Sequence, residues 1–359
     1  MSTPSNADSS AVRPGQVMRR GRWWLLGLLW LMPLAGLLLW FPPGRSAART
    51  LVVYCAHDAE YARPLLERFT LQTGIAVEAR FDTEATKSLG LVNRLLAERE
   101  TPQCDVFWNN ELLGTNRLAN EGLLQAHRGP GWKARADRHR DPGGLWTGFA
   151  ARLRLCMVAP DRCPAQAAEI ERRLSGDDLR RVALARPQFG TTLTQYVAWH
   201  DAWGEQRLWE THDRWLAAGL RLVDGNAATK NLVVSGACDL AFTDSDDYWV
   251  ARDAGAQVDA LPVRVDGATI CIPNTVAILR GTGQPVAAEQ LIEFLLSTEA
   301  ELELARSPSR QIPLGPVPNE LLPAEVRELR EWADEGVDLR DLGASRRAVL
   351  ARLTGEAPP

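Results

Sequence analysis

The chain has 359 residues, of which 45% are hydrophobic and 24% are charged, and its formal net charge is −4 at pH 7. This length is enough for two domains, and the hydrophobic content excludes a chain that is disordered throughout. The slightly negative net charge gives no electrostatic reason to expect nucleic acid as a partner.

The start of the chain combines a basic segment with an apolar one. Residues 1–22 are polar and carry four arginines, and residues 23–41 contain no charged residue. The second segment is long enough to span a bilayer, and the arginines predict that residues 1–22 stay in the cytoplasm. Small residues at 46–48 also fit a signal-peptide cleavage site. We therefore expect either a membrane anchor or a cleaved signal peptide, with the rest of the chain in the periplasm or on the outer face of the inner membrane.

Residues 51–81 predict a strand, a helix and a second strand. The run from Leu51 to Tyr54 is apolar, as in a buried parallel strand. Asp58 is a candidate N-cap, apolar residues follow it at helical spacing, and Gly74 can end the helix. Apolar and polar residues then alternate over 75–81, as in a strand. Together they predict a βαβ unit with a right-handed crossover.

Polar residues follow the next predicted strand. Asp82 or Thr83 can cap a helix whose apolar residues include Leu89 and Leu96. Cys104 to Trp108 predicts another buried strand, which ends before the polar residues 109–111 (Asn-Asn-Glu). Open α/β sheets bind ligands beyond the carboxyl ends of their strands. We therefore expect this polar group and the turn at 56–58 to face one crevice.

The remaining sequence predicts an α/β fold with two lobes and no internal repeat. Its expected elements are irregular structure at 126–145, strands at 146–158, a second α/β region to about 265, a strand at 270–279, a helix at 287–296 and helical structure at 325–352. Lobe one would comprise residues 50–148 and about 270–315, lobe two residues 149–269, and the C-terminal helices of 316–359 would pack on the lobes.

Cysteine spacing and enzyme motifs narrow the chemistry. The six cysteines show no CxxC or Cys/His pattern, which argues against a zinc site. Cys156 and Cys163 can close a small loop in an oxidising compartment, or the cysteines can be buried free thiols. No GxSxG or HExxH motif is present, so we expect no catalytic residues and no enzyme. No GxxxxGK[ST] phosphate loop is present, so any energy for transport must come from a partner ATPase.

Several motifs in a fixed order resemble one protein family. They are LVVYCAHDAE, CDVFWNNE, FGTT, DGNAATKNLVVSGACDLAFTDSDDYW and SRQIPLGP. Over residues 50 to about 315 the chain resembles the type 2 periplasmic solute-binding proteins of ABC importers, most closely the ferric-iron-binding group. The resemblance implies a two-lobed periplasmic binding protein-like II fold that closes on its solute as a monomer. It also implies an ABC permease and ATPase as partners.

The resemblance implies an Fe(III) site formed by His57, Glu111, Asp247 and Tyr248. Asp247 stands where the iron-binding group has the first of two adjacent tyrosines. Glu111 lies one residue after the position expected for a glutamate, which Asn110 occupies. Fe(III) is a hard cation, and carboxylate, phenolate and imidazole groups suit it.

The same sequence also predicts contacts to an anion. Gly190, Thr191 and Thr192 precede a helix, whose first amides and hydroxyls can bind an anion. In the iron-binding proteins these positions and that of Asn226 hold a synergistic anion, here phosphate or carbonate. Lys87 and Lys230 are hypothesised to reach an anionic solute from opposite lobes. The other predicted solute contacts are Asp58, Thr86, Asn110, Asp244 and Asp246.

Alternative ligands and roles remain within the same fold. The predicted crevice could take an organic phosphonate, a polyamine or another small solute in place of iron. An uncleaved anchor at 23–41 would instead suit a membrane-tethered ligand sensor that signals through a partner protein. No resident cofactor is expected in any of these cases.

Overall fold

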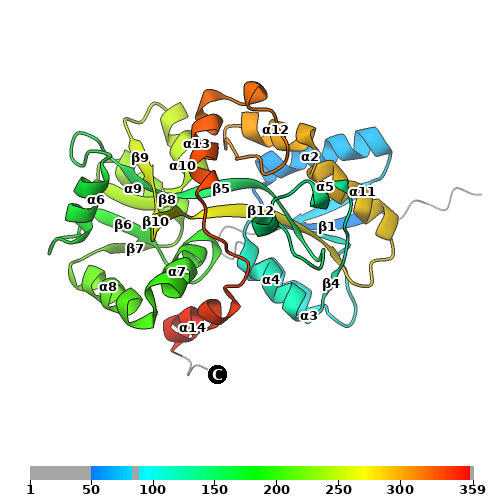
Figure 1. Cartoon of the computed structure of the whole chain (residues 1–359), viewed down its shortest axis with the longest axis horizontal. Coiled ribbons are helices and arrows are strands. Elements are labelled where there is room, and N and C mark those ends of the chain that lie inside the picture. Colours follow the sequence, from blue (N-terminus) through cyan, green and yellow to red (C-terminus); the bar gives the residue numbers. More distant parts are fainter. Residues whose placement is uncertain (1–49, 83–88, 356–359) are drawn as a thin grey trace, which may run out of the picture. The chain divides into compact units, whose positions relative to one another are not determined.

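The computed structural model describes residues 50–82 and 89–355 (Figure 1). Within these ranges a ten-stranded mixed sheet has the order β2-β1-β3-β12-β5-β8-β6-β7, with β4 paired to β12 and β9 paired to β5. A second sheet pairs β10 with β11. The strands are β1 (Leu51–Cys55), β2 (Val77–Phe81), β3 (Val106–Asn109), β4 (Leu124–Gln125), β5 (Thr147–Val158), β6 (Val182–Ala185), β7 (Arg221–Val223), β8 (Leu240–Asp244), β9 (Asp259–Pro262), β10 (Arg264–Val265), β11 (Ala268–Thr269) and β12 (Cys271–Leu279).

Helices connect these strands and cover both faces of the sheet (Figure 1). They are α2 (Ala59–Thr73), α3 (Leu89–Ala97), α4 (Leu112–Asn120), α5 (Pro130–Lys133), α6 (Ala167–Leu174), α7 (Gly190–Trp203), α8 (Glu205–Ala217), α9 (Asn226–Val234), α10 (Ser245–Asp253), α11 (Pro285–Leu295), α12 (Thr298–Arg306), α13 (Ala324–Asp334) and α14 (Gly343–Thr354). Short 3-10 helices lie at Asp137–His139 and Asn319–Leu321.

The predicted βαβ unit is confirmed. β1 pairs in parallel with both β2 and β3, and α2 connects β1 to β2. Gly74 ends α2 with φ at +74°, in the left-handed region that favours glycine. Asp58 holds the N-cap position, although its side chain makes no capping hydrogen bond.

Alternation along β1 divides the core between the two faces of the sheet. Leu51 and Val53 pack in one cluster with buried residues of α2 and α11, such as Phe69 and Leu291. Tyr54 points to the other face, where it joins a cluster that includes residues of α3 and α4. Both faces of β1 are therefore covered, which explains why its sequence is apolar without interruption.

Two long buried strands link the halves of the sheet. β12 pairs with β5 as far as Leu153, whereas β8 pairs with β5 from Arg154 onward. We call β2-β1-β3-β12 the first half of the sheet and β8-β6-β7 the second half. β5 passes from one to the other, so its residues near 153 lie where the two halves meet.

The C-terminal region contains two helices where the sequence predicted helical structure over 325–352. α13 and α14 are separated by residues 335–342, where the Asp338 carboxylate accepts a hydrogen bond from the Arg340 backbone. Such local side-chain bonds compete with helix formation. α14 packs on α7 and on α4, so it touches helices that belong to both halves.

The sequence predicted a membrane anchor or a cleaved signal peptide near the start of the chain. Among residues 50–82 and 89–355, no helix is both long enough and apolar enough to cross a membrane. The predicted basic segment 1–22 and apolar segment 23–41 lie outside the described residues.

All six cysteines are buried free thiols, so Cys156 and Cys163 do not close a loop.

Candidate functional site

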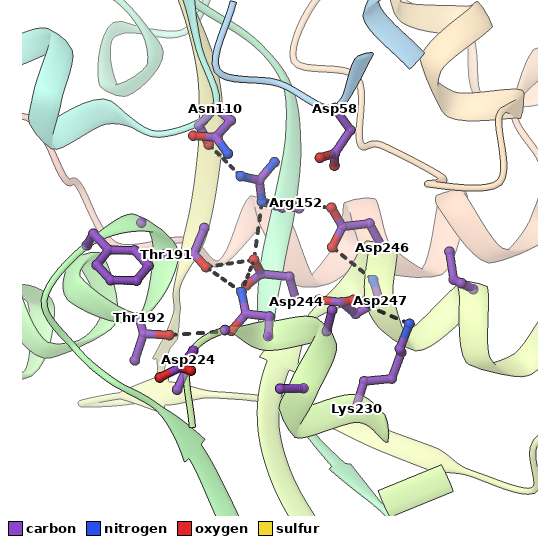
Figure 2. Close-up of a pocket in the computed structure, with 18 of the residues that line it drawn as sticks. Asp58, Asn110, Arg152, Thr191, Thr192, Asp224, Lys230, Asp244, Asp246 and Asp247 are labelled. Carbon is purple, nitrogen blue, oxygen red and sulfur yellow. Dashed lines mark hydrogen bonds and ion pairs between the residues drawn. The ribbon is translucent and has the colours of Figure 1, made fainter. Parts of the chain in front are cut away.

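A cavity of about 530 Å³ lies between the two halves of the sheet (Figure 2). Its walls come from the segments that follow β1, β3, β6, β7 and β8. These segments carry polar residues at the carboxyl ends of the strands, where open α/β sheets bind ligands. The lining residues are Asp58, Glu60, Tyr61, Asn110, Arg152, Ala185, Arg186, Phe189, Gly190, Thr191, Thr192, Asp224, Gly225, Asn226, Ala227, Ala228, Lys230, Asp244, Asp246, Asp247 and Val250.

A buried arginine organises the wall formed by the second half. The Arg154 side chain is fully buried, and its Nη1 donates to Asp244 Oδ1 at 2.7 Å and to Asn226 Oδ1 at 3.0 Å. Its Nε donates to Gln195 Oε1 at 2.8 Å. These bonds fix β5, α7, the start of α9 and the end of β8 relative to one another. A buried guanidinium requires such partners, because an unpaired buried charge is very costly.

The Asp244 carboxylate is the centre of this network. Its Oδ2 accepts from Thr191 Oγ1 at 2.7 Å and from Asn226 Nδ2 at 2.8 Å, and Arg152 Nε lies 3.3 Å away. Charge-assisted bonds of this kind are stronger than neutral ones. Asp244 is therefore held in one position at the base of the cavity (Figure 2).

Arg152 joins the two walls of the cavity. Its Nη2 donates to the backbone oxygen of Asn110 at 2.6 Å, and its Nε lies 4.0 Å from Asp246 Oδ2. Burial by itself lowers the pKa of this guanidinium, but the carboxylates of Asp246 and Asp244 outweigh that effect and the pKa is raised. Arg152 is therefore a permanent cation between the segments after β3 and β8.

The region around α10 carries excess negative charge. Asp247 Oδ1 lies 3.8 Å from Lys230 Nζ, and its Oδ2 accepts from Thr243 Oγ1 at 3.1 Å. Burial raises the pKa of Asp247 to about 7, with repulsion from Asp246 and Asp244 adding to the effect and Lys230 opposing it. Among the lining residues within 50–82 and 89–355, six carry carboxylates and three carry cationic side chains.

The structure brings together most of the residues that were predicted to contact solute. Those that line the cavity are Asp58, Asn110, Gly190, Thr191, Thr192, Asn226, Lys230, Asp244 and Asp246. Thr86 and Lys87 lie outside the described residues. The amide and hydroxyl of Asn226 and Thr191, predicted to bind an external anion, instead bind the Asp244 carboxylate.

The structure does not bring the four predicted iron ligands together. His57 is buried and stacked on Trp108, with a centroid separation of 5.4 Å. Glu111 accepts from the backbone N–H of Leu113 and of Gly114, so it caps α4. Of these four residues, Asp247 alone lines the cavity.

Asp247 and Tyr248 are neighbours on α10, but their side chains point to different environments. Consecutive residues on an α-helix point about 100° apart. Asp247 faces the cavity, whereas Tyr248 packs in the core and its phenol oxygen accepts from Arg252 at 3.1 Å. Within the described residues, no group of three or more His, Cys, Asp or Glu side chains is arranged to hold a metal ion.

Sequence reasoning missed Arg152, Arg154 and Tyr61. The two arginines lie within the strands predicted at 146–158, and Tyr61 is one of the residues at helical spacing in the helix predicted after Asp58. A signal was present, because residues two apart on a strand share one face and a charged pair there must find partners. Two arginines inside an apolar strand therefore indicated a buried polar site.

Comparisons with known proteins agree with this fold. The family model of bacterial extracellular solute-binding proteins matches residues 51–306. Among solved structures, iron-bound HitA from Pseudomonas aeruginosa has a TM-score of 0.67 at 21% identity, with 84% of this chain and 99% of that chain covered. Apo ferric ion-binding protein A from Pasteurella haemolytica has a TM-score of 0.75 at 20% identity, with coverages of 86% and 97%.

A third solved structure broadens the range of ligands among the neighbours. AfuA from Actinobacillus pleuropneumoniae, with fructose-6-phosphate bound, has a TM-score of 0.70 at 17% identity and covers 86% of this chain and 98% of its own. Among curated proteins, none matches this sequence. The solved structures share the fold with this chain, and the proteins they represent bind different solutes.

Proposed function

The chain belongs to the family of bacterial extracellular solute-binding proteins, and we propose from this premise that it captures a small organic solute in its cavity for an ABC importer. As the sequence predicted, it is a binding protein and not an enzyme. The two halves of the sheet act as the two lobes that close on the solute. An ABC permease and its ATPase receive the loaded protein on the periplasmic side of the inner membrane.

The size and position of the cavity carry this proposal. Its volume of about 530 Å³ falls in the range of small-molecule sites, which is roughly 300–1,000 Å³. Asp58 and Asn110 belong to segments of the first half, whereas Thr191 and Asp246 belong to helices of the second half. A solute in this position contacts both halves, so its binding energy can favour the closed form.

The arrangement of oxygen ligands favours an organic solute over Fe(III). His57, Glu111 and Tyr248 each have a structural partner away from the cavity. A bare cation needs several ligand atoms converging at about 2 Å, and a cavity of this size is better matched to a molecule with several polar groups. Fe(III) with an anion, which the resemblance implied, is therefore the weaker candidate.

A thermal-shift screen of the full-length protein tests the proposal. The probes are Fe(III) citrate, inorganic phosphate, spermidine, methylphosphonate and a set of amino acids and sugar phosphates. Because ligands that bind only the folded state raise the melting temperature by mass action, we expect at least one organic probe to do so. The proposal fails if Fe(III) alone stabilises the protein with a tyrosinate-to-iron absorption band, or if no organic probe acts.

A cavity-filling variant locates the binding. Ala228 lines the cavity, and Ala228→Trp should abolish the stabilisation by the active probe. Ala168 is exposed on α6 and is absent from the cavity lining, so Ala168→Trp is the matched control and should retain full binding. Equal binding by both variants would place the solute elsewhere.

A further inference from the structure

The donors around Asp244 have the composition of an anion site. They are the hydroxyl of Thr191, the amide of Asn226 and the guanidinium of Arg154, at 2.7, 2.8 and 2.7 Å from its carboxylate oxygens. Thr191 and Asn226 lie in the first turns of α7 and α9, where backbone N–H groups lack intrahelical acceptors and favour negative charge. Hydroxyl, amide and guanidinium donors at two helix N-termini are what a phosphate or carboxylate group requires.

The carboxylate that these donors hold belongs to the protein itself. Asp244 ends β8, its side chain is 5% exposed, and Arg152 approaches it from the other side at 3.3 Å. An anionic group on a solute would have to displace this carboxylate or lie beside it. Both are unfavourable, because displacement leaves Asp244 without its partners and adjacent placement brings like charges together.

We propose that Asp244 occupies this anion subsite as a built-in anion and that the cavity therefore accepts an organic cation, which the carboxylates of Asp58, Asp246 and Asp247 face. The inference rests on the proposed function, because it names the charge of the solute that the cavity takes. Asp58 comes from the segment after β1, and Asp246 and Asp247 come from α10, so they approach the solute space from opposite walls (Figure 2).

The electrostatics of the cavity support a positively charged solute. Among the described residues that line it, six carry carboxylates, and Arg152, Arg186 and Lys230 carry positive charges, while the buried Arg154 offsets Asp244. Burial and repulsion from Asp246 and Asp244 raise the pKa of Asp247 to about 7, although Lys230 is near. A cation placed between Asp246 and Asp247 would relieve that repulsion. Tyr61, on α2 beside Asp58, adds an aromatic ring to the wall opposite Asp246 and Asp247, and aromatic rings also attract cations.

Removing the Asp244 carboxylate should create an anion site that the wild type lacks. We expect isothermal titration of full-length Asp244→Ala with inorganic phosphate to show saturable binding, where wild type shows none. Phosphate should also raise the melting temperature of the variant in a concentration-dependent way. Wild type should bind spermidine and should bind neither phosphate nor methylphosphonate.

Asp224→Ala is the matched control. Asp224 lines the same cavity, but its side chain is 97% exposed and its recorded ion pair is with Arg186 at the surface. The substitution removes the same charge without vacating the donors around Asp244, so it should gain no phosphate binding. An equal gain by both variants would mean that net charge controls anion binding, and would overturn the assignment of the subsite.

Further outcomes separate this inference from the proposed function. If Asp244→Ala is unstable in phosphate-free buffer, recovery of folding with rising phosphate supports the assignment, and absence of recovery in both Asp244→Ala and Asp244→Ser overturns it. Phosphate or methylphosphonate binding to wild type also overturns it, although the protein would remain a solute-binding protein. If no organic probe binds wild type while Asp244→Ala gains phosphate, the proposed function fails and the built-in anion stands.

Discussion

Two buried arginine–carboxylate pairs have different structural roles in this molecule. Arg135 and Glu301 are both fully buried at a distance of 3.1 Å, and Glu301 also accepts from the backbone N–H groups of Ala150, Leu314 and Gly315. Arg154 and Asp244 are also buried, at a distance of 2.7 Å, but their other partners include side chains of α7 and α9 beside the cavity.

The difference lies in what each carboxylate holds. Glu301 ties backbone segments that are distant in sequence, including Ala150, whose φ of +42° is unusual for a residue with a side chain. Asp244 instead organises side chains that face a space large enough for a solute. Burial and charge alone do not distinguish a structural ion pair from a functional one, whereas the kind of partner and the neighbouring cavity do.

The largest expected effect is on stability at the structural pair. Glu301→Gln should lower the free energy of unfolding by about 3–5 kcal/mol, because Arg135 is left buried without its counter-charge. Urea unfolding of the full-length protein measures this, and spermidine affinity should not change. Glu299 is on the same helix but is 59% exposed in its pair with Arg68, so Glu299→Gln should cost less than about 1 kcal/mol. Similar losses in both variants would contradict the comparison.

A smaller loss is expected at the pair beside the cavity. Arg154→Met should destabilise the protein by about 2–3 kcal/mol, because water in the cavity can partly solvate the Asp244 carboxylate that it leaves behind. Adding Asp244→Asn should restore part of this loss, since the lone charge is then removed. A double-mutant cycle in urea measures the coupling. A double variant no more stable than Arg154→Met would show that the two residues act independently.

The sequence predicted the frame of the site because that frame depends on local patterns. Apolar runs marked β1, β3 and β12, and the polar residues after the strands marked where a crevice would form. The sequence also predicted a helix at Gly190, Thr191 and Thr192, and α7 begins at Gly190. Local spacing was therefore sufficient to gather nine predicted solute contacts around one cavity.

The chemistry inside the frame depends on partners that are distant in sequence. Arg154 lies 90 residues before Asp244, and nothing near Arg154 indicates that pairing. The predicted iron ligands do not converge, because Glu111, one residue late after β3, caps α4, and Tyr248 lies on the buried side of α10. A motif with the right residue types can therefore lose its site when its register changes by one residue.

The cavity carboxylates of Asp58, Asp246 and Asp247 should affect binding and leave stability nearly unchanged. Asp246→Asn is expected to weaken spermidine binding by about tenfold, because it removes one carboxylate that faces the cation. Isothermal titration measures the affinity, and urea unfolding should agree with wild type within about 0.5 kcal/mol. Asp253→Asn is the control on the same helix, since Asp253 pairs with Arg310 and does not line the cavity. A stability loss without a binding loss would assign Asp246 to the structural class.

The smallest predicted effect is the dependence of cation binding on pH. The charged or hydrogen-bonding groups around Asp247 are Asp246, Asp244, Thr243, Lys230 and Arg152. With a pKa of about 7, the ionised fraction of Asp247 rises from about one tenth at pH 6 to about nine tenths at pH 8. A cation binds the ionised carboxylate more tightly, so spermidine affinity should rise with pH.

The rise should be somewhat less than tenfold, because Asp58 and Asp246 attract the cation at both pH values. Titrations at pH 6, 7 and 8 measure it, with release of protons on binding in the same interval. Asp247→Asn should bind more weakly at pH 8 and with an affinity that is flat over this range. A slope that persists in Asp247→Asn would assign the titration to a group other than Asp247.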